Sequence, residues 1–162
     1  MEITFRELAE SNIPSCMEIM KENYPQDNER FWDAVLEKDI KDVLNKEYPS
    51  MFLVATLNES IVGFGCYLDF QSLNRYKISW MNISPNMQGK GIGRLLVKEL
   101  EKCIMENSTQ NFSIILETDK PVFYKKLGYK KYGKNKDNDL MKKVLNKSPK
   151  RLSDGEWLDG QR

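Results

Sequence analysis

A glycine-rich connection between a predicted strand and a predicted helix constrains this sequence more than any other feature. It reads Gln88-Gly89-Lys90-Gly91-Ile92-Gly93-Arg94. Alternating glycines allow a ligand to lie against bare backbone, and the start of a helix offers unpaired N–H groups with a partial positive charge. The stretch is therefore predicted to bind a phosphate group.

Several common kinds of site do not match this sequence. No G-x-x-x-x-G-K-S/T pattern is present, and Leu96 stands where G-x-G-x-x-G requires its last glycine. Histidine is absent from the sequence, which excludes Ser-His-Asp and Cys-His nucleophile pairs and imidazole zinc sites. Cys16, Cys66 and Cys103 are scattered without C-x-x-C spacing. We therefore expect buried, inert thiols and predict no metal site.

Hydrophobic periodicity predicts alternating strands and helices. Two helical stripes end before Pro25 and near Asn45, and a third follows the glycine-rich stretch to about Asn107. Strands are predicted at 3–7, 51–57, 61–70, 76–83, 112–117, 129–132 and 139–145, and a short helix at 121–127. Strand, glycine loop, helix and strand form a βαβ unit, so the strands at 76–83 and 112–117 should be parallel. The predicted fold is a single-domain α/β (α+β) protein, with a mixed, mostly antiparallel sheet of about seven strands flanked by about four helices.

Charge is divided unevenly along the chain. Residues 1–76 contain 7 Lys and Arg against 14 Asp and Glu, whereas residues 77–162 contain 18 against 10. Two solvated faces of opposite sign would explain this division. A basic half that holds a polyanion and an acidic half that faces a cation would explain it equally.

The amino-terminal residues and the apolar runs suggest a location. Residues 1–7 are acidic and alternate like a strand, whereas a signal peptide begins with basic residues. The longest apolar stretch, 51–57, is far shorter than the roughly 20 residues that cross a bilayer. We expect a cytoplasmic protein with no membrane partner.

Two separate motifs resemble the GNAT superfamily of acyl-CoA-dependent N-acyltransferases. Gln88, Gly91 and Gly93 match its pyrophosphate signature Q/R-x-x-G-x-G/A, and residues 123–129 match its F-Y-x-x-L-G-F/Y segment. The resemblance covers about residues 1–146. It implies one GNAT acetyltransferase domain over 1–146, followed by a polar tail over 147–162.

The resemblance implies acetyl-CoA as cosubstrate and no metal. Backbone groups near Met81 and Ile83 would pair with its pantetheine arm. The pyrophosphate would be held by the amides of Gln88, Gly89, Lys90, Gly91, Ile92 and Gly93, with Arg94 nearby. The implied reaction is direct attack by a primary amine, from a small molecule or a peptide, on the thioester in a ternary complex.

The resemblance also raises the question of catalytic groups. Many members of the family carry a glutamate on the fourth strand, but residues 77–82 contain no carboxylate. Glu117 and Asp69 are the candidate general bases, and each could instead be a salt-bridged carboxylate. Tyr124, the tyrosine of the second motif, is the candidate general acid, with a packed core tyrosine as the alternative.

Other functions and an unassigned segment stay open. A non-catalytic acyl-CoA-binding or sensing domain would keep the glycine loop and lack the base. Nucleic-acid binding through the lysines of 120–136 is disfavoured by a net charge of only +1. The tail contains Trp157 and Leu158, and is either disordered or docked on this subunit or on a second copy in a homodimer.

Overall fold

A computed structural model describes residues 1–26, 30–46, 49–70 and 73–147. These residues form a seven-stranded sheet with the order β1-β2-β3-β4-β5-β7-β6. Among its neighbouring strands, only β4 and β5 run parallel. The predicted mixed sheet and the predicted βαβ unit are therefore confirmed.

The elements follow the predicted order. The strands are β1 (Ile3–Glu7), β2 (Ser50–Leu57), β3 (Ser60–Asp69), β4 (Arg75–Ile83), β5 (Phe112–Thr118), β6 (Lys130–Asn135) and β7 (Asn138–Leu145). The helices are α1 (Ile13–Asn23), α2 (Arg30–Leu44), α3 (Ile92–Asn107) and α4 (Pro121–Lys125), with 3-10 turns η1 (Glu10–Asn12) and η4 (Pro85–Met87).

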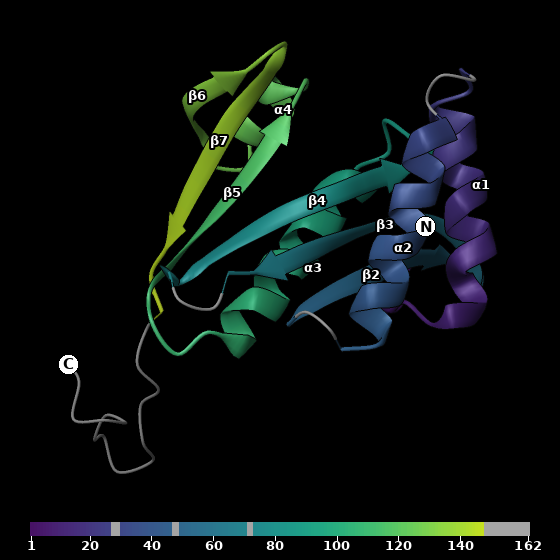
Figure 1. Cartoon of the computed structure of the whole chain (residues 1–162), viewed down its shortest axis with the longest axis horizontal. Coiled ribbons are helices and arrows are strands. Elements are labelled where there is room, and N and C mark those ends of the chain that lie inside the picture. Colours follow the sequence, from purple (N-terminus) through teal and green to yellow (C-terminus); the bar gives the residue numbers. More distant parts are fainter. Residues whose placement is uncertain (27–29, 47–48, 71–72, 148–162) are drawn as a thin grey trace.

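Helices cover both faces of the sheet (Figure 1). On one face, α1 and α2 pack on β2 and β3 around Phe52, Phe64 and Cys66. On the other face, α3 packs on β3 and β4, and Leu96 and Leu100 belong to a cluster that also includes Ile114 and Leu116 of β5. Each helix contributes an apolar stripe, so the sheet lies between two hydrophobic clusters.

The two halves of the sheet, β1–β4 and β5–β7, are joined by only a short stretch of pairing between β4 and β5. β4 and β5 pair only through Arg75–Ser113, Tyr76–Ile114 and Lys77–Ile115. Beyond these pairs the two strands diverge, as Figure 1 shows. The backbone of β4 past Lys77 therefore has no strand partner on its β5 side.

A β-bulge interrupts β4 just after this joint. The register with β3 pairs Cys66 with Ser79 but Phe64 with Asn82, which leaves one extra residue on β4. Trp80 lies in this bulge with φ of 57°, a conformation that non-glycine residues rarely adopt. The bulge redirects the backbone of β4 where that strand leaves β5.

Some sequence-based boundaries and burial assignments need correction. The helix predicted over 121–127 ends at Lys125, because Leu127 and Gly128 donate tighter i to i−3 backbone hydrogen bonds. Cys16 and Cys66 are buried as expected, but Cys103 is only half-buried. Burial raises the pKa of the Cys16 thiol to about 12. Trp157 and Leu158 lie outside the described residues.

Candidate functional site

The glycine-rich stretch lies at the end of β4 and at the start of α3. Gly89 and Gly91 have φ values of 75° and 83°, and a Cβ at either position would meet no atom within 4 Å. Backbone conformation, and not lack of space, therefore selects glycine there. Leu95 N donates the first helical hydrogen bond to Gly91 O, so the preceding amides are the unpaired donors of the first turn of α3.

Gly93, unlike Gly89 and Gly91, has close neighbours from other elements. A Cβ on this residue would lie 3.4 Å from the ring of Phe123 on α4 and 3.8 Å from Ile83. These are ordinary van der Waals distances, so packing would admit an alanine here, in agreement with the G/A that the motif allows at this position. Two glycines of the stretch thus determine the conformation of the loop, and the third lies where α3, α4 and the end of β4 meet.

The side chain of Gln88 turns back into the protein. Its Nε2 donates to Asn23 Oδ1 and to Ile83 O, both at 3.0 Å. Asn23 Nδ2 donates in turn to Asn82 Oδ1 and Ile83 O, also at 3.0 Å. Gln88 therefore ties the glycine loop to the end of α1 through its side chain. No sequence motif marks Asn23, although a polar residue such as Asn82 inside an apolar strand was a signal for a buried network.

Backbone groups of β4 face the side where β5 diverges. Ser84 N donates to Val62 O at 2.8 Å, so Ser84 directs its backbone groups toward β3. Alternation along the strand directs those of Ile83 and Met81 toward β5. The Ile83 carbonyl is already hydrogen-bonded by Asn23 and Gln88.

Three side chains hold the bulge of β4 in place. Trp80 Nε1 donates to Asp39 Oδ2 of α2 at 2.9 Å. The Trp80 ring meets Trp32 edge to face, with ring centroids 6.3 Å apart. Asn82 Nδ2 donates to Trp80 O at 3.2 Å. Asp39 was missed by sequence reasoning, because no motif links a residue of α2 to a strand 41 positions away.

Tyr124 lies in the short helix α4, next to Phe123, whose ring is the nearest neighbour of Gly93 outside α3. It is 7% exposed and packs edge to face on Phe123 and Tyr129, at centroid distances of 4.8 and 5.7 Å. Burial, with a smaller contribution from Asp119, raises the pKa of Tyr124 to about 12. The phenol therefore stays protonated across the physiological range.

The two candidate bases lie on opposite faces of the sheet. Glu117 is exposed on the face away from α3, where Asn135 Nδ2 donates to its Oε1 at 3.0 Å. Asp69 extends from β3 on the α3 face, next to Tyr67 and Tyr76. Tyr67 is hydrogen-bonded by Asn107, the last residue of α3. Asp69 is thus near the end of α3 opposite to the glycine loop, about 24 Å along the helix.

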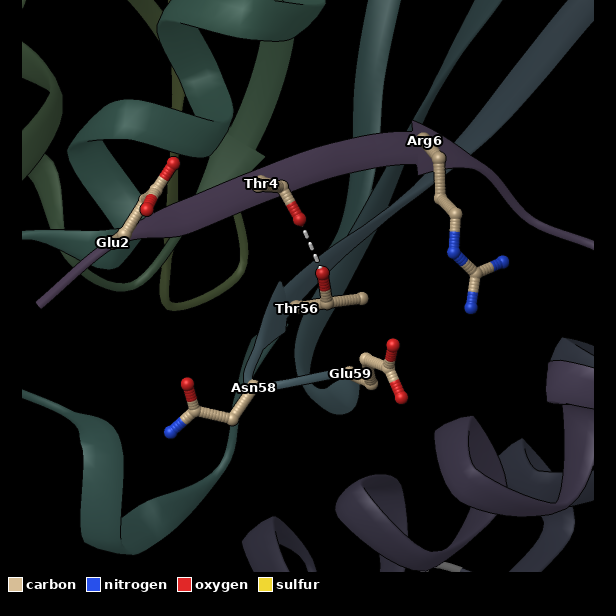
Figure 2. A pocket seen from close by; sticks show the side chains of 6 residues that line it. All are labelled: Glu2, Thr4, Arg6, Thr56, Asn58 and Glu59. Carbon is tan, nitrogen blue, oxygen red and sulfur yellow. Dashed lines mark hydrogen bonds between the residues drawn. The ribbon is translucent and has the colours of Figure 1, made fainter.

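A hollow of about 550 Å³ lies at the β1 edge of the sheet, away from every predicted site residue (Figure 2). The hydroxyls of Thr4 and Thr56 are 2.5 Å apart across it. Its charged side chains carry both signs and are largely exposed, so the hollow has no common chemistry for one ligand. Its lining residues are Glu2, Thr4, Arg6, Thr56, Asn58 and Glu59.

Two kinds of feature are absent from the described ranges. No three His, Cys, Asp or Glu side chains there come close enough together to hold a metal ion. None of the helices built from those residues has the length and apolar character needed to span a bilayer.

Comparisons with known proteins point to one family. Residues 49–131 match the family model described as an acetyltransferase (GNAT) domain. An acetyltransferase of Pectobacterium atrosepticum is 31% identical over 98 residues, which are 57% of this chain and 66% of that relative, just under two thirds of its length.

Solved structures share the fold at low sequence identity. The PaiA N-acetyltransferase of Thermoplasma acidophilum, solved with coenzyme A, has a TM-score of 0.72 at 18% identity, over 90% of this chain and 100% of that one. A phosphinothricin acetyltransferase of Sinorhizobium meliloti, solved with acetyl-CoA, has a TM-score of 0.68 at 17% identity, over 99% of this chain and 95% of that one.

Proposed function

Because the chain belongs to the GNAT acetyltransferase family, we propose that it transfers the acetyl group of acetyl-CoA to a primary amine by direct attack in a ternary complex. The observation that carries this proposal is the position of the glycine loop. Its two left-handed glycines lie at the start of α3, beside the point where the backbone of β4 is free of β5.

The residues of the loop fit the anionic part of acetyl-CoA. Next to the first-turn amides of α3, no atom lies within 4 Å of the place that a Cβ of Gly89 or Gly91 would take. Lys90 and Arg94 are exposed on either side of Gly91 and add positive charge. A pyrophosphate bound there would accept hydrogen bonds from the amides of residues 89–93. The Met81 backbone and the Ile83 N–H would pair with the amide groups of the pantetheine arm.

Acetyl-CoA supplies an activated thioester, and the chain supplies the proton transfers. At pH 7 a lysine-type amine costs roughly 4.6 kcal/mol to deprotonate, whereas an α-amine costs about 1.4 kcal/mol. Of the two candidate bases, Glu117 has the better position, because it lies at the end of β5 on the face that α3 leaves uncovered. Glu117 accepts a proton from the acceptor ammonium, directly or through water.

Tyr124 is proposed as the general acid. Its Oη donates a proton to the departing sulfur and regains one, through solvent, from the acetylated nitrogen. With its pKa raised to about 12, Tyr124 is protonated at neutral pH, so its proton is present when negative charge develops on the sulfur. Asp69, at the other end of α3, is the alternative base and would have to act from the α3 face.

Turnover with a panel of amines tests the function. Thiol release from acetyl-CoA should depend on both the enzyme and an amine, and calorimetry should detect acetyl-CoA binding without any acceptor. Binding without turnover for every amine would favour the acyl-CoA-binding or sensing domain instead. Failure to bind acetyl-CoA would contradict both.

A further inference from the structure

A second hollow lies on the face of the sheet away from α3. It has a volume of about 190 Å³ and is lined by Arg75, Ile115, Tyr132 and Lys142. Ile115 alternates with Ile114 and Leu116, which pack on the α3 side, so Ile115 points to the opposite face. Lys142 likewise alternates with Lys143, whose Nζ reaches Glu101 of α3.

Positive side chains run across this face from strand to strand. Lys77 is paired with Ile115, Ile115 with Lys142, and Lys142 with Lys130, so these side chains share one face. Arg75 extends the row at the hollow. In the part of the chain that the structure describes, neither Arg75 nor any of these three lysines forms an ion pair. The row is therefore an uncompensated positive surface.

Arg75 also carries a buried donor without a protein partner. Its Nε is shielded from solvent and has no hydrogen-bond acceptor among the described residues. Buried polar groups are normally hydrogen-bonded, and an unmatched charged donor is costly. A guanidinium presents its donors in a fork that matches a carboxylate or a phosphate. The chemistry of the hollow thus suits an anionic group.

The position of the hollow relates it to the proposed reaction. Lys77–Ile115 is the last pair that joins β4 to β5. Glu117 lies two residues beyond Ile115 on the same face, about 7 Å along β5, and Trp80 lies three residues beyond Lys77, about 10 Å along β4. An acceptor whose amine faces Glu117 would extend its other end over the hollow.

We propose that the hollow binds an anionic group of the acceptor, so that the substrates are amines that carry a carboxylate or a phosphate about 7–10 Å from the reacting nitrogen. This inference rests on the proposed acetyl transfer. Arg75 and Lys142 bind the anion, and Tyr132, which is 53% exposed, covers one side of it. Amines without an anionic group leave the Arg75 guanidinium without a hydrogen-bond acceptor and are therefore poor substrates.

Matched acceptors test this specificity. Triglycine and triglycinamide differ only in the terminal carboxylate, and 6-aminohexyl phosphate and 6-aminohexanol differ only in the phosphate. The anionic member of at least one pair should have the higher kcat/KM, by about tenfold or more, since a charge-assisted hydrogen bond contributes that much. The pair with the larger ratio identifies carboxylate or phosphate as the natural group.

Charge variants assign the preference to the hollow. The double variant Arg75→Gln/Lys142→Gln should bring the ratio within each pair close to one and leave the acetyl-CoA affinity unchanged. The double variant Lys98→Gln/Lys102→Gln removes an equal charge from two exposed positions on α3 and should keep the ratio. Equal kcat/KM within both pairs for the unmodified protein, or a ratio that survives in the folded double variant, would overturn the inference.

Direct binding separates this inference from the proposed function. Calorimetry with triglycine and with 6-aminohexyl phosphate, on protein saturated with coenzyme A, should show binding that the double variant loses. If the protein releases no thiol with any amine, the acetyl transfer fails. In that case, anion binding that the double variant loses still supports the hollow as an anion site. Anion binding that the double variant keeps would contradict this assignment, and so would a lack of anion binding in the unmodified protein.

Discussion

The indole nitrogen of Trp80 donates a 2.9 Å hydrogen bond to the carboxylate of Asp39 and so joins the bulge of β4 to α2. Trp80 has φ of 57°, and such a conformation persists in a non-glycine residue only where its surroundings hold it. The contacts with Asp39, Trp32 and Asn82 stabilise this conformation of Trp80. The backbone of β4 that is proposed to pair with the pantetheine arm is thus held from the layer of helices on the opposite face of the sheet.

Replacing Asp39 should affect catalysis more than cofactor binding. Asp39→Ala removes the hydrogen-bond acceptor and should lower kcat by about tenfold, because small displacements of reacting groups are costly. Acetyl-CoA affinity, set mainly by the glycine loop, should change little. Asp39→Asn keeps a carbonyl acceptor and should restore most of kcat. An Asn variant as impaired as the Ala variant would show that the charge of Asp39 matters, and not its hydrogen bond.

Gly91→Glu should abolish acetyl-CoA binding. The change adds a side chain and a negative charge beside the amides proposed to hold the pyrophosphate. Gly91→Ala is the matched control, because it introduces the same strain at φ of 83° without the charge, at a cost of about 1 kcal/mol. Calorimetry should therefore show weakened binding for Ala and none for Glu. Undiminished affinity in a folded Glu variant would remove the loop from the cofactor site.

Tyr124→Phe should reduce kcat on the order of 10²-fold, within the range of general-acid assistance. The substitution keeps the ring that packs on Phe123 and Tyr129, so stability and acetyl-CoA affinity should be nearly unchanged. The measurement requires an acceptor for which chemistry limits the rate. Full kcat under that condition would mean that the thiolate leaves without Tyr124.

Stability should decrease at alkaline pH. Burial raises the pKa values of Tyr67 and Tyr124 from about 10 to about 12, and that of Cys16 from about 9 to about 12. The folded state thus favours their neutral forms, whereas the unfolded chain ionises earlier. The free energy of unfolding should be insensitive to these groups below about pH 9 and fall between about pH 9 and 12.

Urea titrations across this pH range provide the measurement. Tyr124→Phe removes one of the three groups, so its unfolding free energy should fall less steeply between about pH 10 and 12. A slope identical to that of the unmodified protein would show that Tyr124 ionises alike in the folded and unfolded states.

The features that the sequence predicted well are local or periodic. The three glycines, the stripe of α3 and the apolar strands on either side determine the βαβ unit without information from elsewhere in the chain. The βαβ unit in turn requires β4 and β5 to be parallel. The bulge has no such signature, because Trp80 and Met81 look like any two apolar residues of a strand.

Contacts between distant segments required the structure. Trp80 meets Asp39, and Gln88 meets Asn23, through the packing of helices on the sheet. Arg75 and Lys142 come together only because the register of β4, β5 and β7 aligns them. A shift of the β7 register by one residue would place Lys142 on the other face of the sheet. The proposed anion site therefore could not be predicted from the sequence.

The short joint between β4 and β5 has a consequence for folding cooperativity. Three residue pairs alone would connect β4 and β5 only weakly. The apolar cluster under α3, however, contains Tyr76 and Ile78 of β4 together with Ile114 and Leu116 of β5. The helix therefore couples the two halves of the sheet, and neither half can lose its core alone. Hydrogen exchange should report one global opening free energy for the slowest amides of both β3 and β7.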